Sequence, residues 1–545
     1  MAELPYGARV GMQPTELRLA VCAAGDDEVR ELTFDPMAGA LADDAADIAF
    51  SFDGETIEVS IVPKCELYVK ACALELRHAF ATEELVLMNG YQSWTDTVER
   101  PAWARMRGLR GIPSVVVNHF VLDGGGDYRF RGYSGVPGRQ HGYTYGTFRR
   151  GEGMVLVGSL DESRGFTEIS IYARHGRVVL TTECPLRPLA AGVPYVLGRY
   201  AIVRGILEDC YDRYFELMGV APRTTRKLVG FSSWYRHYNG IDGPKLAEDL
   251  AGIVTVLPPL LEEFSGEGAE SPIALFQIDD GYCKVGDWLD IDSGKFPHGL
   301  APLVESARNA GFLPGLWIAP FVCERESRIF VEHPEWLLRD EGGNPVPTGS
   351  HWTGGYALDT RNPEVRSYVL EVLQTMVGEW GFGLLKMDFL YAACMLPHDG
   401  LNRGQLMTDA VDLLRMGAGD DCLILGCGVP LGPVFGKFDY CRIGCDVGLD
   451  WNDSLYMQVL HRERVSTKNS LANTYGRAPL DGRAFGNDPD VFFLRKSVRL
   501  TQDQRDELLF ADADLGSVFL TSDNMGAWDE AQLDRYRQAL KLFLE

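Results

Sequence analysis

The stretch Gly383-Leu384-Leu385-Lys386-Met387-Asp388-Phe389-Leu390-Tyr391 is a short apolar run that carries a lysine and, two residues later, an aspartate. Its length and composition predict a buried β-strand. Because side chains alternate between the two faces of a strand, Lys386 and Asp388 point the same way. Two charges on one face of a buried strand are costly unless they form an internal ion pair or face a wet, functional cavity. The neighbouring strands decide between these two interpretations.

Apolar runs alternate with helical patterns from residue 226 to the end of the chain. The predicted strands are 227–234, 273–279, 312–319, 383–388, 422–427, 439–443, 490–493 and 516–521. The predicted helices are 244–262, 299–310, 363–380, 404–416, 454–472, 501–511 and 528–544. Strands that alternate with helices indicate βα units and a parallel sheet. Eight such strands predict an α/β fold, a (β/α)8 TIM barrel over residues 226–545.

Residues 1–225 are β-rich and predict a separate N-terminal domain. Short runs of β-branched residues predict strands at 57–62, 85–88, 114–121 and 177–182, with Gly, Asp and Pro between them. Many short strands at irregular spacing indicate a β-sandwich. Two aromatic segments, 89–94 and 141–146, are typical of sandwich core or turns, although they could also rim a sugar site.

Charge and cysteine usage narrow the class of protein. The formal net charge of −25 argues against a nucleic-acid partner and an anionic membrane surface, and favours an uncharged substrate. The sequence shows no signal-peptide pattern and no run of apolar residues long enough for a transmembrane helix. The twelve cysteines form no C-x-x-C pair and no zinc pattern. We therefore expect a cytoplasmic protein without a metal or other cofactor.

Polar and aromatic residues gather at the predicted carboxyl ends of the strands, where (β/α)8 barrels carry their chemistry. In chain order they are Trp234, Asp279, Asp280, Trp317, Lys386, Asp388, Cys427, Arg442, Asp446 and Asp490. A single aspartate at a strand end is common in turns, but acidic residues at four strand ends indicate a functional site. Glycoside hydrolysis needs such acids, because one carboxylate acts at the anomeric carbon while another protonates the leaving oxygen.

Five segments resemble, in this order, the motifs of the melibiase-type α-galactosidases, glycoside hydrolase family 36. They are Gln277-Ile-Asp-Asp-Gly-Tyr282, Leu316-Trp-Ile-Ala-Pro-Phe321, Leu385-Lys-Met-Asp-Phe389, Cys441-Arg-Ile-Gly-Cys-Asp446 and Asn487-Asp-Pro-Asp490. The resemblance covers about residues 227–525, and segment 89–94 resembles a motif of that family's N-terminal β-supersandwich. Tyr282 stands where the family usually has Trp, and Ala319 where Glu is common, which affects substrate choice more than mechanism.

The resemblance implies a retaining mechanism with Asp388 as nucleophile and Asp446 as acid/base. It implies a sugar-binding role for the remaining residues: Asp279 and Asp280 at hydroxyls 4 and 6, Lys386 at hydroxyls 3 and 4, Arg442 and Cys427 near hydroxyl 2, Trp317 and Trp234 as walls, and Asp490 in the last motif. Lys386 and Arg442 are expected to keep Asp388 ionised through their positive charge.

The implied substrate is a small oligosaccharide or glycoconjugate with a terminal α-D-galactosyl residue, and the family also implies a homo-oligomer. Two related activities stay open. An α-N-acetylgalactosaminidase needs space beside hydroxyl 2, near Cys427 and Arg442, and an α-galactosyl transglycosylase needs an acceptor site that excludes water. Less favoured are a non-catalytic sugar-binding barrel and an enzyme that uses Lys386 as a Schiff-base lysine. Asp388 beside Lys386 favours the charged amine and so argues against the last of these.

Overall fold

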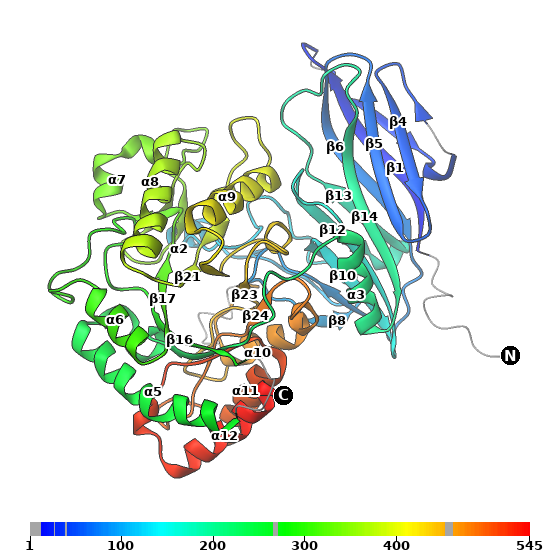
Figure 1. Cartoon of the computed structure of the whole chain (residues 1–545). Coiled ribbons are helices and arrows are strands. Elements are labelled where there is room, and N and C mark those ends of the chain that lie inside the picture. The colour runs from blue at the N-terminus through cyan, green and yellow to red at the C-terminus, as the bar shows by residue number, and fades with distance from the viewer. Residues whose placement is uncertain (1–11, 27, 39–40, 265–270, 453–461) are drawn as a thin grey trace.

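The computed structural model describes residues 12–26, 28–38, 41–264, 271–452 and 462–545. Figure 1 shows a β-rich unit, coloured blue to teal, beside a barrel that runs from green to red. Cyan segments, including α2 (Ser114–Phe120), cross from the β-rich unit to the barrel. We propose the boundary between the two domains near residue 225, in the segment between α3 (Leu207–Met218) and β15 (Leu228–Ser232).

The N-terminal unit consists of two antiparallel sheets, in the strand orders β2-β1-β6-β13-β12-β9 and β3-β4-β5-β14-β11-β10-β7-β8. In β5 (Thr56–Pro63) every second residue is buried, so the period-2 pattern of a half-buried strand is present. The buried faces enclose a hydrophobic core of their own. The other strands are β1 (Gln13–Ala23), β2 (Arg30–Phe34), β3 (Leu41–Ala42), β4 (Ala46–Phe52), β6 (Leu67–Arg77), β7 (Leu85–Met88), β8 (Glu99–Pro101), β9 (Arg139–Tyr143), β10 (Tyr145–Arg150), β11 (Gly153–Ser159), β12 (Thr167–Tyr172), β13 (Arg177–Thr182) and β14 (Tyr195–Gly205).

The predicted strand at 114–121 is wrong, because residues 114–120 form the short helix α2. None of its residues is buried, and Val115 is 78% exposed. β-Branched residues favour strands mainly by packing on a half-buried pleated surface, and this segment has no such surface to pack on. The predicted strands at 57–62, 85–88 and 177–182 are confirmed as β5, β7 and β13.

The barrel sheet is entirely parallel and has the order β24-β23-β22-β21-β17-β16-β15-β26-β25. Its strands are β15, β16 (Ile273–Ile278), β17 (Leu313–Ile318), β21 (Leu384–Met387), β22 (Leu423–Gly426), β23 (Tyr440–Arg442), β24 (Gly486–Asp488), β25 (Val491–Phe492) and β26 (Val518–Thr521). The two end strands of this order, β24 and β25, are consecutive in the chain, so the sheet returns on itself as a (β/α)8 barrel. Together β24 and β25 form the seventh strand, which is interrupted at Pro489-Asp490. The predicted strand 490–493 covers only the second part, β25.

The helices that follow the strands confirm most of the predicted pattern. They are α4 (Trp234–His237), α5 (Gly243–Phe264), α6 (Ala301–Asn309), α8 (Pro363–Gln374), α9 (Arg403–Ala418), α10 (Thr467–Arg477), α11 (Gln502–Leu515) and α12 (Glu530–Leu544). The predicted start of a helix at Asn362-Pro363 is correct, since the Asn362 side chain accepts a hydrogen bond from the Glu364 amide at 2.9 Å. Among the described helices, none is long and apolar enough to cross a membrane.

The predicted helix 454–472 is only partly correct. Residues 454–461 lie outside the described residues, and residues 462–466 are not helical. Helix α10 begins at Thr467 because the Ser466 side chain caps it, accepting a hydrogen bond from the Asn469 amide at 3.3 Å.

A small sheet is inserted between the third and fourth barrel strands. It has the order β18-β20-β19 and is formed by β18 (Val322–Glu324), β19 (Pro347–Gly349) and β20 (Gly355–Ala357), with α7 (Arg328–Glu332) between the first two. β19 and β20 pair antiparallel and form a hairpin. Because the insertion begins directly after β17, this hairpin belongs to the carboxyl end of the barrel. This hairpin becomes part of the site.

Arg477 joins the segment 89–94 of the sandwich unit to the top of the barrel. Its guanidinium is fully buried and donates to Asn89 Oδ1 at 3.1 Å, to the Gln92 carbonyl at 3.2 Å and to the Ile443 carbonyl at 2.8 Å. Ile443 directly follows β23, so one side chain ties the two units together at a barrel strand end. The segment 89–94 is thereby held against the carboxyl ends of the strands.

Candidate active site

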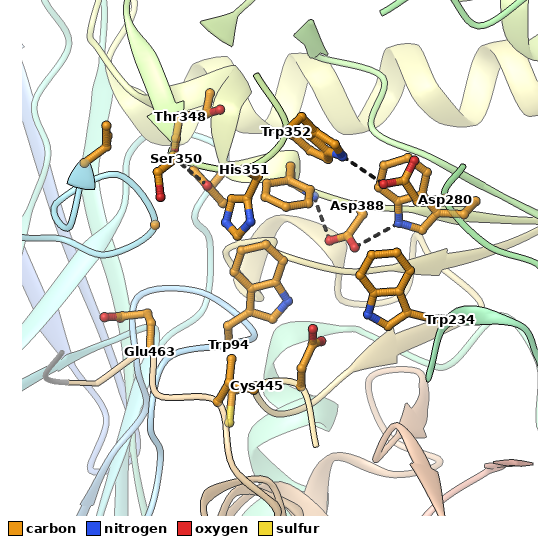
Figure 2. A pocket seen from close by; sticks show the side chains of 18 of the residues that line it. Trp94, Trp234, Asp280, Thr348, Ser350, His351, Trp352, Asp388, Cys445 and Glu463 are labelled. Atoms are coloured by element: carbon orange, nitrogen blue, oxygen red, sulfur yellow. Dashed lines mark hydrogen bonds between the residues drawn. The ribbon is translucent and has the colours of Figure 1, made fainter. Parts of the chain in front are cut away.

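The carboxyl ends of the barrel strands open into a cavity of about 400 Å³. Seven of the ten residues predicted from the strand ends line it: Trp234, Asp279, Asp280, Trp317, Lys386, Asp388 and Asp446. Figure 2 shows Asp388, Asp280 and Trp234 in one part of this cavity, with Trp94 and His351 beside them. The barrel therefore brings together side chains that are up to 212 residues apart in the sequence, from Trp234 to Asp446.

Asp388 is held rigidly at the end of β21. Its Oδ2 accepts a hydrogen bond from Trp317 Nε1 at 3.1 Å, and its Oδ1 accepts one from the Phe389 amide at 2.8 Å. Burial raises the pKa of Asp388, against the opposing effects of Lys386, Cys427 and Trp317. Lys386 thus acts on this pKa in the expected direction, but burial outweighs it, and the Lys386 ammonium group is bonded to Asp279.

Lys386 forms its ion pair with Asp279, the side chain at the end of β16. The Lys386 Nζ lies 2.9 Å from Asp279 Oδ2, and both side chains are buried. Although burial acts to lower it, the Asp279 carboxylate raises the pKa of Lys386 above its usual value. A lysine held in its charged form is a poor Schiff-base nucleophile, which argues against that chemistry.

Asp280 accepts a hydrogen bond from Trp352 Nε1 at 2.8 Å, as Figure 2 shows. Trp352 lies in the hairpin between β19 and β20, so the inserted sheet supplies an aromatic side chain to the two aspartates that follow β16. Burial and the neighbouring Asp279 raise the pKa of Asp280 to about 6, against the effect of the Trp352 hydrogen bond.

The Asp280→Asn variant is expected to be more stable than the wild type at pH 8 but not at pH 3.5. The folded pKa of about 6 exceeds the ordinary value of 3.8, so the folded chain keeps a proton that the unfolded chain releases. Stability therefore falls as the pH rises from about 4 to about 6, and asparagine removes this cost, a gain of about 2–3 kcal/mol above pH 6. Urea unfolding at both pH values measures the difference. The exposed Asp290→Asn serves as control, and an equal gain at both pH values would contradict the assignment.

Arg442, at the end of β23, joins three carboxylates. It donates to Asp446 Oδ1 at 3.0 Å, to Asp488 Oδ2 at 3.2 Å and to Asp490 Oδ1 at 2.8 Å. The Asp446 side chain is 41% exposed and lines the cavity, whereas Arg442 is 3% exposed and does not. Arg442 thus bonds Asp446, the proposed acid/base, from a buried position outside the cavity lining.

Asp490 also lies behind the cavity wall, where its Oδ2 accepts hydrogen bonds from the Tyr235 hydroxyl and, at 2.9 Å, from the Val447 amide. Burial raises the pKa of Asp490 to about 7, against the effect of Arg442. Its oxygens are engaged by Arg442, Tyr235 and Val447, and Asp490 is not among the residues that line the cavity, so its predicted contact with the sugar stays a prediction.

Cys427, predicted to lie near hydroxyl 2, is 1% exposed and does not line the cavity. Trp94 of the sandwich unit covers it, with Nε1 at 3.1 Å from Cys427 Sγ. A side chain on the next residue, Gly428, would meet the Trp94 ring at 2.9 Å. Trp94 therefore fills the space beside Cys427.

Several lining residues were not predicted from the strand ends. They come from the sandwich unit (Phe120, Val121, Leu122, Gly125, Tyr128), from the β19–β20 hairpin (Thr348, Gly349, Ser350, His351, Trp352) and from other loops (Asn239, Phe389, Tyr391, Cys445, Glu463, Val465). One signal could have found the hairpin, because the segment between the third strand and residue 363 is much longer than an ordinary βα connection. Trp94 belongs to the aromatic segment 89–94, which is typical of sandwich core or turns and could also rim a sugar site.

Backbone strain is concentrated at this site. Trp352, Phe389 and Asp490 adopt positive φ angles of 53°, 54° and 92°, which are uncommon for residues other than glycine. Phe389 in this conformation turns its amide toward the Asp388 carboxylate, and Asp490 stands at the break in the seventh strand. Such strain persists only where the surrounding structure holds it, and it is common at functional sites.

Carboxylates and tryptophan rings that converge at the carboxyl end of a (β/α)8 barrel define a carbohydrate-active barrel of the glycoside hydrolase type. Comparison with known proteins supports this assignment to the glycoside hydrolases. Residues 259–399 match the melibiase family model. An α-galactosidase from Escherichia coli is 28% identical over 170 residues, which cover 29% of this chain and 23% of that relative's length.

Two solved structures share the fold over most of the chain. TtGalA, an α-galactosidase from Thermus thermophilus, has a TM-score of 0.71 at 24% identity, covering 92% of this chain and 94% of that one. The family 36 α-galactosidase AgaA from Geobacillus stearothermophilus has a TM-score of 0.60 at 12% identity, covering 94% of this chain and 69% of that one. The resemblance to melibiase-type α-galactosidases is confirmed. The match to the melibiase model is confined to residues 259–399, and the fold, a (β/α)8 barrel with an N-terminal sandwich, is that of the glycoside hydrolase family 36 α-galactosidases.

Proposed function

We propose that the protein is a retaining α-glycosidase that releases terminal α-D-galactosyl residues from small oligosaccharides or glycoconjugates. The observation that carries the proposal is that Asp388 and Asp446, from the ends of β21 and β23, line the same cavity together with the Asp279–Lys386 pair. The proteins with the same fold are named as α-galactosidases, and one of them was solved with p-nitrophenyl α-D-galactopyranoside.

Two carboxylates support a double displacement. Asp388 attacks the anomeric carbon and forms a galactosyl–enzyme ester, while Asp446 gives its proton to the glycosidic oxygen as the C–O bond breaks. Water then attacks the anomeric carbon with Asp446 as base, so that the bond from this carbon to Asp388 breaks, the proton returns to Asp446 and Asp388 is freed as a carboxylate. Trp317 and the Phe389 amide hold the Asp388 oxygens in place for attack.

The cavity favours a galactoside over an N-acetylgalactosaminide. The second sugar needs room for an acetamido group beside hydroxyl 2, and the resemblance places that position near Cys427 and Arg442. Trp94 covers Cys427, and neither Cys427 nor Arg442 lines the cavity. These observations support a site without space for the larger substituent.

Assembly and location remain predictions. A homo-oligomer is compatible with the site. The chain's own sandwich unit supplies Trp94 and Tyr128 to the cavity, so these two residues need not come from a second copy. Location in the cytoplasm rests on the composition of the sequence.

The proposal is tested with a panel of aryl α-glycosides: galactoside, N-acetylgalactosaminide and glucoside. We expect turnover of the galactoside, with α-galactose as the first product anomer in a ¹H NMR time course. β-Galactose as the first anomer would contradict retention, and preferred turnover of either other glycoside would contradict the choice of sugar. Galactosyl transfer to a second substrate molecule or to added alcohol in the same spectra would indicate transglycosylation.

A further inference from the structure

A second cavity adjoins the catalytic cavity beyond the carboxyl end of β16. It has a volume of about 680 Å³, and its lining includes charged and hydroxyl side chains from the segment that follows β16: Lys284, Asp287, Asp290, Asp292, Ser293 and Lys295. The Lys284 and Asp290 side chains are 56% and 60% exposed, so this cavity reaches the surface. The mechanism derived above uses none of these residues.

Three residues, Asn239, Asp280 and Trp352, line both cavities and therefore form a partition between them. Figure 2 shows the Trp352 indole beside the Asp280 carboxylate, joined to it by the hydrogen bond described above. Whether the catalytic cavity ends at this partition or continues past it depends on how firmly each of the three residues is held.

Two members of the partition are fixed through the main chain. Lys295 Nζ donates to the Asn239 carbonyl and to the Gly281 carbonyl, both at 2.7 Å. The two backbones are in contact, because a Cβ on Gly281 would lie 2.7 Å from Asn239 Cα. The Asp280 amide donates to Asp279 Oδ1 at 3.0 Å, which fixes the backbone at the end of β16. A change of side chain would therefore not open this part of the partition.

Trp352 closes the rest of the partition with its side chain. The indole donates to Asp280 Oδ2 at 2.8 Å, and its ring centroid lies 5.0 Å from that of Phe389. The hairpin itself is held independently of the indole, since the Thr353 hydroxyl donates to Glu324 Oε2 at 2.9 Å. Replacing the indole with a small side chain would thus join the two cavities without releasing the hairpin.

The proposed mechanism sets which part of the sugar faces this partition. The anomeric carbon, C1, lies at Asp388, which accepts its hydrogen bond from Trp317, whereas Asp280 accepts one from the neighbouring indole of Trp352. The side of the ring away from C1 carries hydroxyls 4 and 6, which are also the hydroxyls that the resemblance implies for Asp280. Hydroxyl 6 stands on a carbon outside the ring, so a group attached to it would project from the ring toward the partition.

We propose that Trp352 is a specificity-determining residue whose indole restricts the enzyme to galactosyl groups without a substituent on hydroxyl 6. The partition leaves no space for such a substituent, and the second cavity offers that space once the indole is removed. The charged and hydroxyl lining of the second cavity suits a polar substituent. This inference rests on the proposed function and adds a limit on the galactosyl group itself.

The test compares p-nitrophenyl α-galactoside with its 6-O-methyl derivative, which has the same leaving group. The measured quantity is the selectivity ratio, which is kcat/KM for the methylated substrate divided by kcat/KM for the unmodified one. We expect Trp352→Ala to raise this ratio by about tenfold or more, the scale on which enzymes discriminate one surplus methyl group. Loss of the hydrogen bond to Asp280 affects both substrates and cancels in the ratio.

Two further variants separate the bulk of the indole from its hydrogen bond. Trp352→Phe keeps an aromatic ring without the N–H donor and should stay within about threefold of the wild-type ratio. Trp352→Leu should raise the ratio in the same direction as alanine but by less, and it serves where the alanine variant does not fold. An equal rise for Trp352→Phe and Trp352→Ala would assign the restriction to the hydrogen bond and overturn the proposal.

The matched control is Tyr356→Ala on β20, an aromatic residue of the same hairpin that is not among the residues lining either cavity. It should leave the ratio unchanged. p-Nitrophenyl N-acetyl-α-galactosaminide controls for general loosening, because a gain on it equal to that on the methylated substrate would overturn the proposal.

Two results with the wild type are distinct from each other. Equal turnover of the methylated and unmodified galactosides would overturn the role of Trp352 and leave the proposed function intact. Turnover of neither would make the proposed function itself fail.

Discussion

The Asp388→Ala variant is expected to lose α-galactosidase turnover by on the order of 10⁴-fold or more, because no other side chain can form the ester with the anomeric carbon. Its fold should persist, since the Asp388 carboxylate is a costly buried group whose partners are Trp317 and the Phe389 amide. Turnover of an aryl α-galactoside, with thermal unfolding in parallel, measures both effects. The exposed Asp412→Ala on α9 is the control and should retain wild-type activity.

Added azide sharpens this test of Asp388. With the carboxylate gone, azide can enter the space and attack the anomeric carbon from the same side, forming a C–N bond as the aryl oxygen leaves with the proton of Asp446. The product should be the β-galactosyl azide, with inverted configuration. Near-normal turnover without azide, or an α-configured azide product, would show that Asp388 is not the nucleophile.

The Asp446→Ala variant is expected to lose about 10²- to 10⁴-fold in kcat/KM for substrates with a sugar leaving group, because such an oxygen must be protonated as it departs. The loss should shrink for p-nitrophenyl α-galactoside and be smallest for α-galactosyl fluoride, whose leaving groups need little or no proton. The basic limb of the pH profile should also disappear. A loss of equal size for all three substrates would contradict the acid/base role.

The product formed with azide separates Asp446 from Asp388. Azide added to Asp446→Ala should give the α-galactosyl azide, formed by attack on the galactosyl–enzyme ester, the opposite anomer to that expected for Asp388→Ala. The two carboxylates are thus assigned by the stereochemistry of the product.

The barrel could be predicted because its signal is local. Each core strand is a short apolar run, and a strand that is buried on both faces shows this directly in the sequence. The positions of β15, β16, β17, β21, β22, β23 and β26 follow from such runs, and the strand-end rule then points to Asp279, Asp280, Lys386, Asp388 and Asp446. The split seventh strand was harder to predict, because strands of three and two residues are too short to show a clear hydrophobic pattern in the sequence.

Whether a strand-end side chain faces the cavity could not be predicted. Arg442, Cys427 and Asp490 stand at strand ends as expected, yet each is buried behind the wall. The direction of such a side chain depends on what packs against it: Trp94 covers Cys427, while Tyr235 and Val447 engage Asp490. These partners come from other elements, and no pattern within the strand itself encodes them.

The sequence by itself determined the class of fold, the two-part organisation and the cluster of acids around Lys386 and Asp388, because hydrophobic periodicity and strand-end position are local properties of the chain. Only the tertiary structure decided that Lys386 pairs with Asp279, that Trp352 binds Asp280 and that Trp94 and Tyr128 line the cavity. Those contacts join segments far apart in the sequence, and they form only once the sandwich unit and the inserted hairpin dock on the barrel.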